Sequence, residues 1–184
     1  MNNNHRNNRN TAPRNNQENT KNSYNKINTE RGDTLIYAMG GLGEVGKNMY
    51  CFEHENEILI IDSGVRFPEE NLLGVDYVIP DYNYLVRNKQ KKKTLIITHG
   101  HEDHIGGIPF LLKSVDIDCI YASRFAVSLI NRKLEERKML KQVKIRKINE
   151  DSSVVTKHFR CGFFNTTHSI PDSLGVVINT PNGR

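Results

Sequence analysis

The run His99-Gly100-His101-Glu102-Asp103-His104 places four potential metal ligands within six residues. It follows the apolar segment Thr94-Leu95-Ile96-Ile97-Thr98, which predicts a short buried strand. Imidazole and carboxylate groups are the ligands that hold zinc-type ions in proteins. Crowding them at the end of a strand is unfavourable unless a positive charge lies between them. The run therefore indicates a metal-dependent hydrolase.

The spacing within this run separates the ligands into two pairs. His99 and His101 are two residues apart, so on an extended segment both side chains point to one side and can bind one ion. Asp103 and His104 follow where the chain turns into a helix expected over 105–113, and they can bind a second ion. Two ions about 3.5–4 Å apart activate water and stabilise a phosphoryl transition state. A polar loop with scattered histidines is the weaker interpretation.

Two further polar residues end predicted strands. Asp62 closes the apolar run 58–61 and is either a cap or the hydrogen-bond partner of a metal-bound histidine, and we favour the partner. His168 ends a strand expected over 162–167. Alone it would be structural, but beside an incomplete two-histidine site we expect it to be the third imidazole on the first ion.

The glycine-rich segment GLGEVGKN (41–48) fits the pattern G-x-G-x-x-G and misses the Walker A pattern at Asn48, where Ser or Thr must bind magnesium. Both nucleotide-binding patterns require a helix directly after the glycines. The next residues, MYCF (49–52), are instead typical of a strand. We therefore expect a tight turn with backbone amides near the active site.

Composition limits the function classes. Residues 1–31 hold six basic residues against two acidic ones, so +4 of the formal net charge of +5 belongs to this segment and +1 to residues 32–184. Twelve of the first 28 residues are Asn, so we expect 1–32 to be a disordered basic tail, either an RNA-binding arm or, as we favour, an extension without a dedicated role. An argument for RNA binding cannot rest on the net charge of the remainder.

Cysteine usage and hydropathy indicate a cytoplasmic protein. The three cysteines are widely spaced and odd in number, which favours reduced, mostly buried thiols. No apolar run approaches the about 20 residues needed to span a bilayer, so no membrane association is expected.

Strands with interspersed helices predict an α/β or α+β domain. The lysine-rich segment 89–93 is expected to be a solvated loop ahead of a buried strand. Beyond a strand over 174–180, Pro181-Asn182-Gly183 predicts a turn whose returning strand is missing, so we expect a truncated chain. The other expected elements are strands over 34–39, 48–53, 57–62, 118–122, 143–148 and 153–156 and a helix over 123–136.

Together these residues resemble the metallo-β-lactamase superfamily and, more narrowly, the ribonuclease J family of its β-CASP branch. The H-x-H-x-D-H pattern alone indicates only the superfamily. The stretches around LLGVDYVIPD (72–81) and THSIPDS (167–173) are more specific to ribonuclease J. The segments that carry the resemblance are GGLGEVGKNMY (40–50), LIIDSGVRFPEENLLGVDYVIPDYNYL (59–85), THGHEDHIGGIPFLL (98–112) and TTHSIPDSLGVVINTP (166–181).

The resemblance implies an αββα sandwich of the metallo-β-lactamase type, of which residues 33–184 are an incomplete N-terminal part. His99, His101 and His168 would hold one zinc, and Asp103 and His104 would hold the other and take part in catalysis. Manganese shares these ligands. The resemblance also implies a structural calcium held by the backbone of Gly74 and the carboxylate of Asp76.

The activity implied is that of a zinc-dependent ribonuclease, both 5′-to-3′ exonuclease and endonuclease, that processes and degrades RNA in the cytoplasm as a homo-oligomer or paralogue complex. Family members continue to an aspartate that bridges the metals, a β-CASP domain with another zinc-binding histidine, and a C-terminal domain. None of these lies within the 184 residues, so we expect an inactive or incomplete fragment. The alternatives are a hydrolase of thioesters, lactams or lactones, and a non-catalytic fragment that binds metal or RNA.

Overall fold

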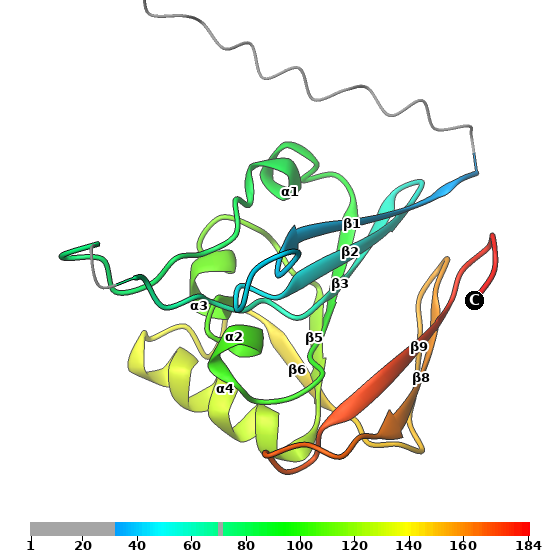
Figure 1. Ribbon diagram of the computed structural model, residues 1–184. Coiled ribbons are helices and arrows are strands. Elements are labelled where there is room, and N and C mark those ends of the chain that lie inside the picture. The colour runs from blue at the N-terminus through cyan, green and yellow to red at the C-terminus, as the bar shows by residue number, and fades with distance from the viewer. Residues whose placement is uncertain (1–31, 70–71) are drawn as a thin grey trace, which may run out of the picture.

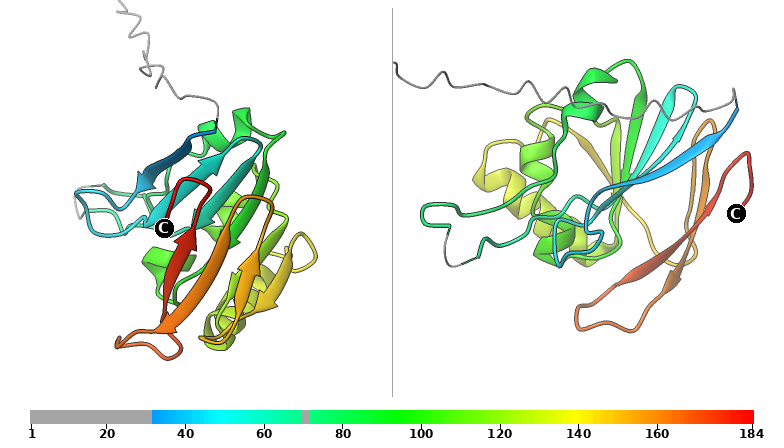
Figure 2. Two further views of the ribbon diagram at one scale, coloured as in Figure 1. Left: turned by 90° about the vertical axis from the view of Figure 1, so that its right-hand side faces the viewer. Right: turned by 45° about the horizontal axis from the view of Figure 1, so that its top comes forward.

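The computed structural model describes residues 32–69 and 72–184, so the expected tail over 1–32 lies almost wholly outside the described residues. A six-stranded sheet forms the middle layer, with helices on one face and a three-stranded sheet against the other (Figures 1 and 2). The described residues thus form helix, sheet and sheet layers, in agreement with the predicted mixture of strands and helices.

The six-stranded sheet follows chain order from β1 to β6, and its pairing changes once, from antiparallel to parallel. The first three strands pair antiparallel, and a tight turn at Glu55 and Asn56 joins the second and third. The remaining strands pair parallel, which requires the crossover segments that carry the helices. The strands are β1 (Thr34–Gly40), β2 (Met49–His54), β3 (Glu57–Ile61), β4 (Lys92–Ile96), β5 (Cys119–Ala122) and β6 (Lys144–Lys147).

The helices cover one face of this sheet (Figure 1). They are α1 (Asn83–Arg87), α2 (Glu102–Ile105), α3 (Ile108–Leu111) and α4 (Arg124–Glu136). The single helix expected over 105–113 is wrong, because Gly106 and Gly107 separate two short helices and the first of them begins inside the metal-ligand run. Among the described residues, no helix has both the length and the apolar composition to cross a bilayer.

The apolar runs at the centre of the sheet are buried on both faces. All five residues of β3 are buried. Ile58 and Ile60 pack into the core beneath the helices, whereas Leu59 and Ile61 pack against the second sheet. A continuous apolar run, rather than an alternating one, is the pattern expected for a strand covered on both sides.

The second sheet consists of β7 (Ser153–Val155), β8 (Arg160–Asn165) and β9 (Leu174–Asn179), all antiparallel. Phe159, Cys161 and Phe163 line its inner face. The predicted turn at 181–183 is confirmed by backbone pairing of Thr180 with Gly183. All three cysteines are buried and unpaired, as their spacing predicted.

The prediction of a solvated loop over 89–93 is wrong at its end. Lys92 and Lys93 belong to β4, and the Lys93 side chain is buried. Its ammonium group donates hydrogen bonds to the backbone carbonyls of Asn88 (2.7 Å) and Lys91 (2.8 Å). These carbonyls satisfy the charge inside the protein, and burial lowers the pKa of Lys93.

Truncation of a central isoleucine tests this layer arrangement. Ile60→Ala should lower the free energy of unfolding by about 2–5 kcal/mol, because it leaves a cavity in a packed core. Ile36→Ala in β1 is the matched control, since Ile36 is 66% exposed, and should change stability by less than about 0.5 kcal/mol. Urea denaturation measures both values, and equal losses would contradict the burial of β3 between two layers.

Candidate metal centre

The sequence-predicted ligands meet at the edge of the sheet where parallel strands β3 and β4 end. Asp62 directly follows β3, and His99 lies three residues beyond β4. Side chains that follow the carboxyl ends of adjacent parallel strands gather at one edge, where α/β proteins commonly place their sites. His168 reaches the same place from the loop between β8 and β9 of the other sheet.

Three imidazoles converge on one point. The Nε2 atom of His99 lies 3.1 Å from Nδ1 of His101, and Nε2 of His168 lies 3.1 Å from each of these two nitrogens. His99 is buried, His101 is half-buried and His168 is exposed, so the cluster opens to solvent on one side. Within residues 32–69 and 72–184, these three form the one group of three or more His, Cys, Asp or Glu side chains close enough to hold a metal ion together.

The donor set fits a divalent cation. Each neutral imidazole carries one ring hydrogen, and a hydrogen on any of these nitrogens would face two others at equal distance. Linear hydrogen bonds therefore cannot satisfy all three atoms, whereas a central cation would. With zinc–nitrogen distances of about 2.0–2.1 Å, tetrahedral geometry separates the nitrogens by roughly 3.3 Å, close to the separation observed.

The electrostatics of His99 favour a free lone pair. Burial, followed by the neighbouring imidazoles of His104, His168 and His101, lowers the pKa of His99 to about 4. The ring is therefore neutral at neutral pH, the form that binds metal ions. Its Nδ1 atom lies 2.9 Å from the Thr98 hydroxyl, which leaves Nε2 directed at the cluster.

Asp103 and His104 form a second pair beside the three imidazoles. The His104 Nε2 atom lies 3.4 Å from Asp103 Oδ2, and the rings of His99 and His104 are 4.0 Å apart between centroids. Burial alone would lower the pKa of His104, but the hydrogen bond and charge of Asp62, with the charge of Asp103, raise it above its ordinary value. The two groups of ligands are thus adjacent.

Asp62 holds this arrangement together. Its buried carboxylate accepts hydrogen bonds from the Thr98 backbone N–H (2.8 Å) and the Thr98 hydroxyl (2.9 Å), and its Oδ2 lies 2.8 Å from His104 Nδ1. The contact engages Nδ1 of His104 and turns Nε2 towards Asp103. The Asp62 backbone has a positive φ of 63°, a conformation uncommon outside glycine that clusters at functional sites.

The backbone after β3 packs tightly against α2. The Ser63 N–H donates to the His104 carbonyl (2.8 Å), and the Gly64 N–H donates to the Asn48 carbonyl (3.0 Å). A Cβ atom on Gly64 would lie 1.5 Å from the Asp103 carbonyl oxygen. The close approach therefore requires glycine at position 64.

The glycine-rich segment 41–48 makes a turn, followed directly by β2. This confirms the expected turn and contradicts a nucleotide-binding loop, which requires a helix there. Sequence reasoning missed Asn48, whose side-chain amide donates to Asp103 Oδ2 (3.1 Å) and lies 3.3 Å from His104 Nε2. Its only signal was its position at the end of the segment predicted to approach the site.

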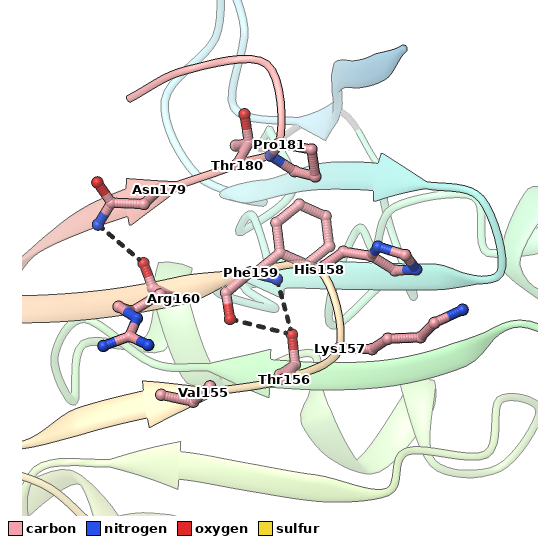
Figure 3. Close-up of a pocket in the computed structure, with 9 residues that line it drawn as sticks. All are labelled: Val155, Thr156, Lys157, His158, Phe159, Arg160, Asn179, Thr180 and Pro181. Carbon is pink, nitrogen blue, oxygen red and sulfur yellow. Dashed lines mark hydrogen bonds between the residues drawn. The ribbon is translucent and has the colours of Figure 1, made fainter. Parts of the chain in front are cut away.

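The expected calcium ligands lie elsewhere. Gly74, with a φ of 79°, and Asp76 are exposed in the loop between β3 and α1. A separate hollow of about 310 Å³ is lined by residues 155–160 and 179–181 (Figure 3). It lies where β8 begins and β9 ends, whereas His168 follows the opposite end of β8, so the hollow is not part of the metal centre.

A family model described as the metallo-beta-lactamase superfamily matches residues 42–180. The chain therefore belongs to this superfamily, whose members bind divalent metal ions. The matched range contains all the predicted zinc ligands. The predicted fold class is confirmed.

The chain is also similar to curated ribonucleases. It is 51% identical over 158 residues to ribonuclease J 1 of Streptococcus pyogenes, covering 86% of this chain and 28% of that protein. It is 53% identical over 151 residues to ribonuclease J of Mycoplasma pneumoniae, covering 82% of this chain and 26% of that protein. The chain thus spans about a quarter of the length of these relatives, and the resemblance to ribonuclease J is confirmed.

Solved structures show the same fold at low sequence identity. The metallo-beta-lactamase fold protein YhfI from Bacillus subtilis matches with a TM-score of 0.53 at 18% identity, covering 80% of this chain and 58% of that one. At this identity the likeness concerns the fold alone.

Replacing Gly64 tests the close packing that supports the second pair of ligands. Gly64→Ala should lower the free energy of unfolding by about 1–3 kcal/mol, because the added methyl group forces the backbone of α2 away. Gly162→Ala in β8 is the matched control, since a Cβ there meets nothing within 4 Å. Urea denaturation compares the two variants. Wild-type stability in Gly64→Ala would show that the segments are not packed this closely.

Proposed function

We propose that this chain carries the metal centre of a zinc-dependent ribonuclease. His99, His101 and His168 would hold one zinc, and Asp103 and His104 would contribute to a second. The observation that carries the proposal is the convergence of three imidazole nitrogens at 3.1 Å beside the Asp103–His104 pair. The relatives named ribonuclease J support RNA as the substrate.

Bound metal ions would supply Lewis-acid activation of water and would offset the negative charge that develops on phosphorus. The protein's own residues prepare the site for this chemistry. The low pKa of His99 keeps its ring neutral, because burial and the adjacent imidazoles disfavour its protonation. Asp62 orients His104 through its Nδ1 atom, so that Nε2 and the Asp103 carboxylate face the same point.

Several finer features of the proposal follow from the ribonuclease J resemblance. They are 5′-to-3′ exonuclease and endonuclease activity, a role in processing and decay of RNA including ribosomal RNA, a cytoplasmic location, and assembly as a homo-oligomer or with a paralogue. Manganese could replace zinc at the same imidazole and carboxylate ligands. A calcium ion at Gly74 and Asp76 remains a prediction from the resemblance.

Substitution of one first-site ligand tests the proposed function. In the protein expressed at its full natural length, His101→Gln should reduce cleavage of 5′-monophosphorylated RNA by at least about 100-fold. Removing even a hydrogen-bond partner of a metal ligand lowers metal affinity or activity by about 10–100-fold. A chelator should abolish wild-type cleavage, and added Zn²⁺ should restore it.

His54→Gln is the matched control, since it makes the same chemical change at the opposite end of β2 from the metal centre. Its cleavage rate should stay within about two-fold of wild type. Undiminished cleavage by His101→Gln, or activity that survives chelation, would rule out the proposed metal mechanism.

A further inference from the structure

The side-chain amide of Asn48 faces both proposed ligands of the second metal. Its Nδ2 atom lies 3.1 Å from Asp103 Oδ2 and 3.3 Å from His104 Nε2, and these two ligand atoms are 3.4 Å apart. The three atoms form a nearly equilateral triangle. An amide NH₂ group has two hydrogens, and the carboxylate and backbone carbonyl of Asp103 can accept both of them.

The backbone fixes Asn48 in this position from two sides. Its N–H donates to the Asp103 carbonyl (3.0 Å), and its own carbonyl accepts the Gly64 N–H (3.0 Å). The side-chain amide adds another hydrogen bond to the Asp103 carbonyl (3.1 Å). Asn48 is therefore attached to Asp103 by three hydrogen bonds, one from its backbone N–H and two from its side-chain amide, and its side chain is held beside the two ligands.

The carbonyl end of the amide has a matching place. A Cβ atom on Gly41 would lie 2.5 Å from Asn48 Oδ1. The amide therefore occupies space that only the absence of a side chain at Gly41 leaves open. Gly41 has a φ of 84°, which favours glycine in any case. The glycine-rich turn thus provides both the backbone conformation and the space that the Asn48 side chain occupies.

The chemistry of the partners requires a donor at this point. The Asp103 carboxylate can only accept hydrogen bonds when ionised. When the neutral His104 ring donates its Nδ1 hydrogen to Asp62, its Nε2 presents a lone pair that can bind a metal ion. The Asn48 NH₂ group, 3.1 Å from Asp103 Oδ2, is that donor, and it leaves the His104 Nε2 lone pair available to the metal.

We propose that Asn48 is the positioning residue of the second metal site. It holds the Asp103 carboxylate in the orientation in which it binds the metal beside His104, and so reduces the ordering that metal binding requires. The inference rests on the proposed metal centre but concerns a residue outside its ligand set. The proposed role predicts that replacing Asn48 changes the affinity for the second metal ion only.

Titration with Co²⁺, followed by visible absorption and calorimetry on the metal-free protein at its full natural length, tests this role. Asn48→Ala should weaken binding of the second equivalent by about 10–100-fold. The first equivalent, held by the three histidines, should bind as in wild type, which also shows that the variant is folded. Asn179→Ala, at the end of β9, is the matched control and should bind both equivalents normally.

Asn48→Asp is a second variant of the same shape. It places a carboxylate oxygen where the amide nitrogen faces Asp103 and His104, so it should tighten the second equivalent while leaving the first unchanged. A structural role would not produce opposite shifts in the two variants. Second-equivalent affinity within two-fold of wild type in either variant would overturn the inference.

The same titration separates this inference from the proposed function. If the wild-type protein binds two equivalents and Asn48→Ala binds both normally, only the role of Asn48 fails. If the wild-type protein binds a single equivalent, the second site and the role of Asn48 fail together. If it binds none, the proposed metal centre fails as well.

Discussion

The buried carboxylate of Asp62 is the interaction on which the site depends. Burying a charge is strongly unfavourable unless hydrogen bonds satisfy it. Here the Thr98 backbone N–H and hydroxyl donate to it, and the His104 ring lies within hydrogen-bonding distance. These partners come from the segment after β4 and from α2, so one carboxylate fixes three parts of the chain relative to one another. The positive φ of Asp62 directs it towards them.

Thr98 extends this connection to the second sheet. While its N–H and hydroxyl bind Asp62, its backbone carbonyl accepts a hydrogen bond from the Leu174 N–H (2.9 Å) at the start of β9. The loop that carries His168 lies just before β9, so this contact places the third imidazole beside His99 and His101. The three-histidine cluster proposed as the first metal site therefore depends on the packing of the two sheets, and not only on the local H-x-H spacing.

The local sequence predicts those parts of the site that follow from strand ends and spacing. His99, His101 and His168 each end or follow a strand, and the structure brings them together. Asp62 could likewise be expected near a histidine, because it ends a buried strand. These predictions need only the period of a strand and the convergence of parallel strands at one edge.

The features that the sequence did not predict depend on long-range contacts. Asn48 meets Asp103, 55 residues away, through both backbone and side chain. Gly107 interrupts the expected helix where its N–H donates to the Ser63 carbonyl (2.8 Å), and a Cβ there would lie 2.7 Å from the Gly64 carbonyl. Lys93 is the exception, because the carbonyls that satisfy its charge belong to Asn88 and Lys91 in the loop just before β4. A run of lysines nevertheless predicts solvent exposure, so the sequence did not indicate this burial.

Crystals of the protein grown with zinc, measured with X-rays on both sides of the zinc absorption edge, test the central claim most directly. We expect an anomalous peak at about 2.0–2.1 Å from the facing nitrogens of His99, His101 and His168. An occupied zinc site elsewhere, with these three imidazoles left unligated, would contradict it.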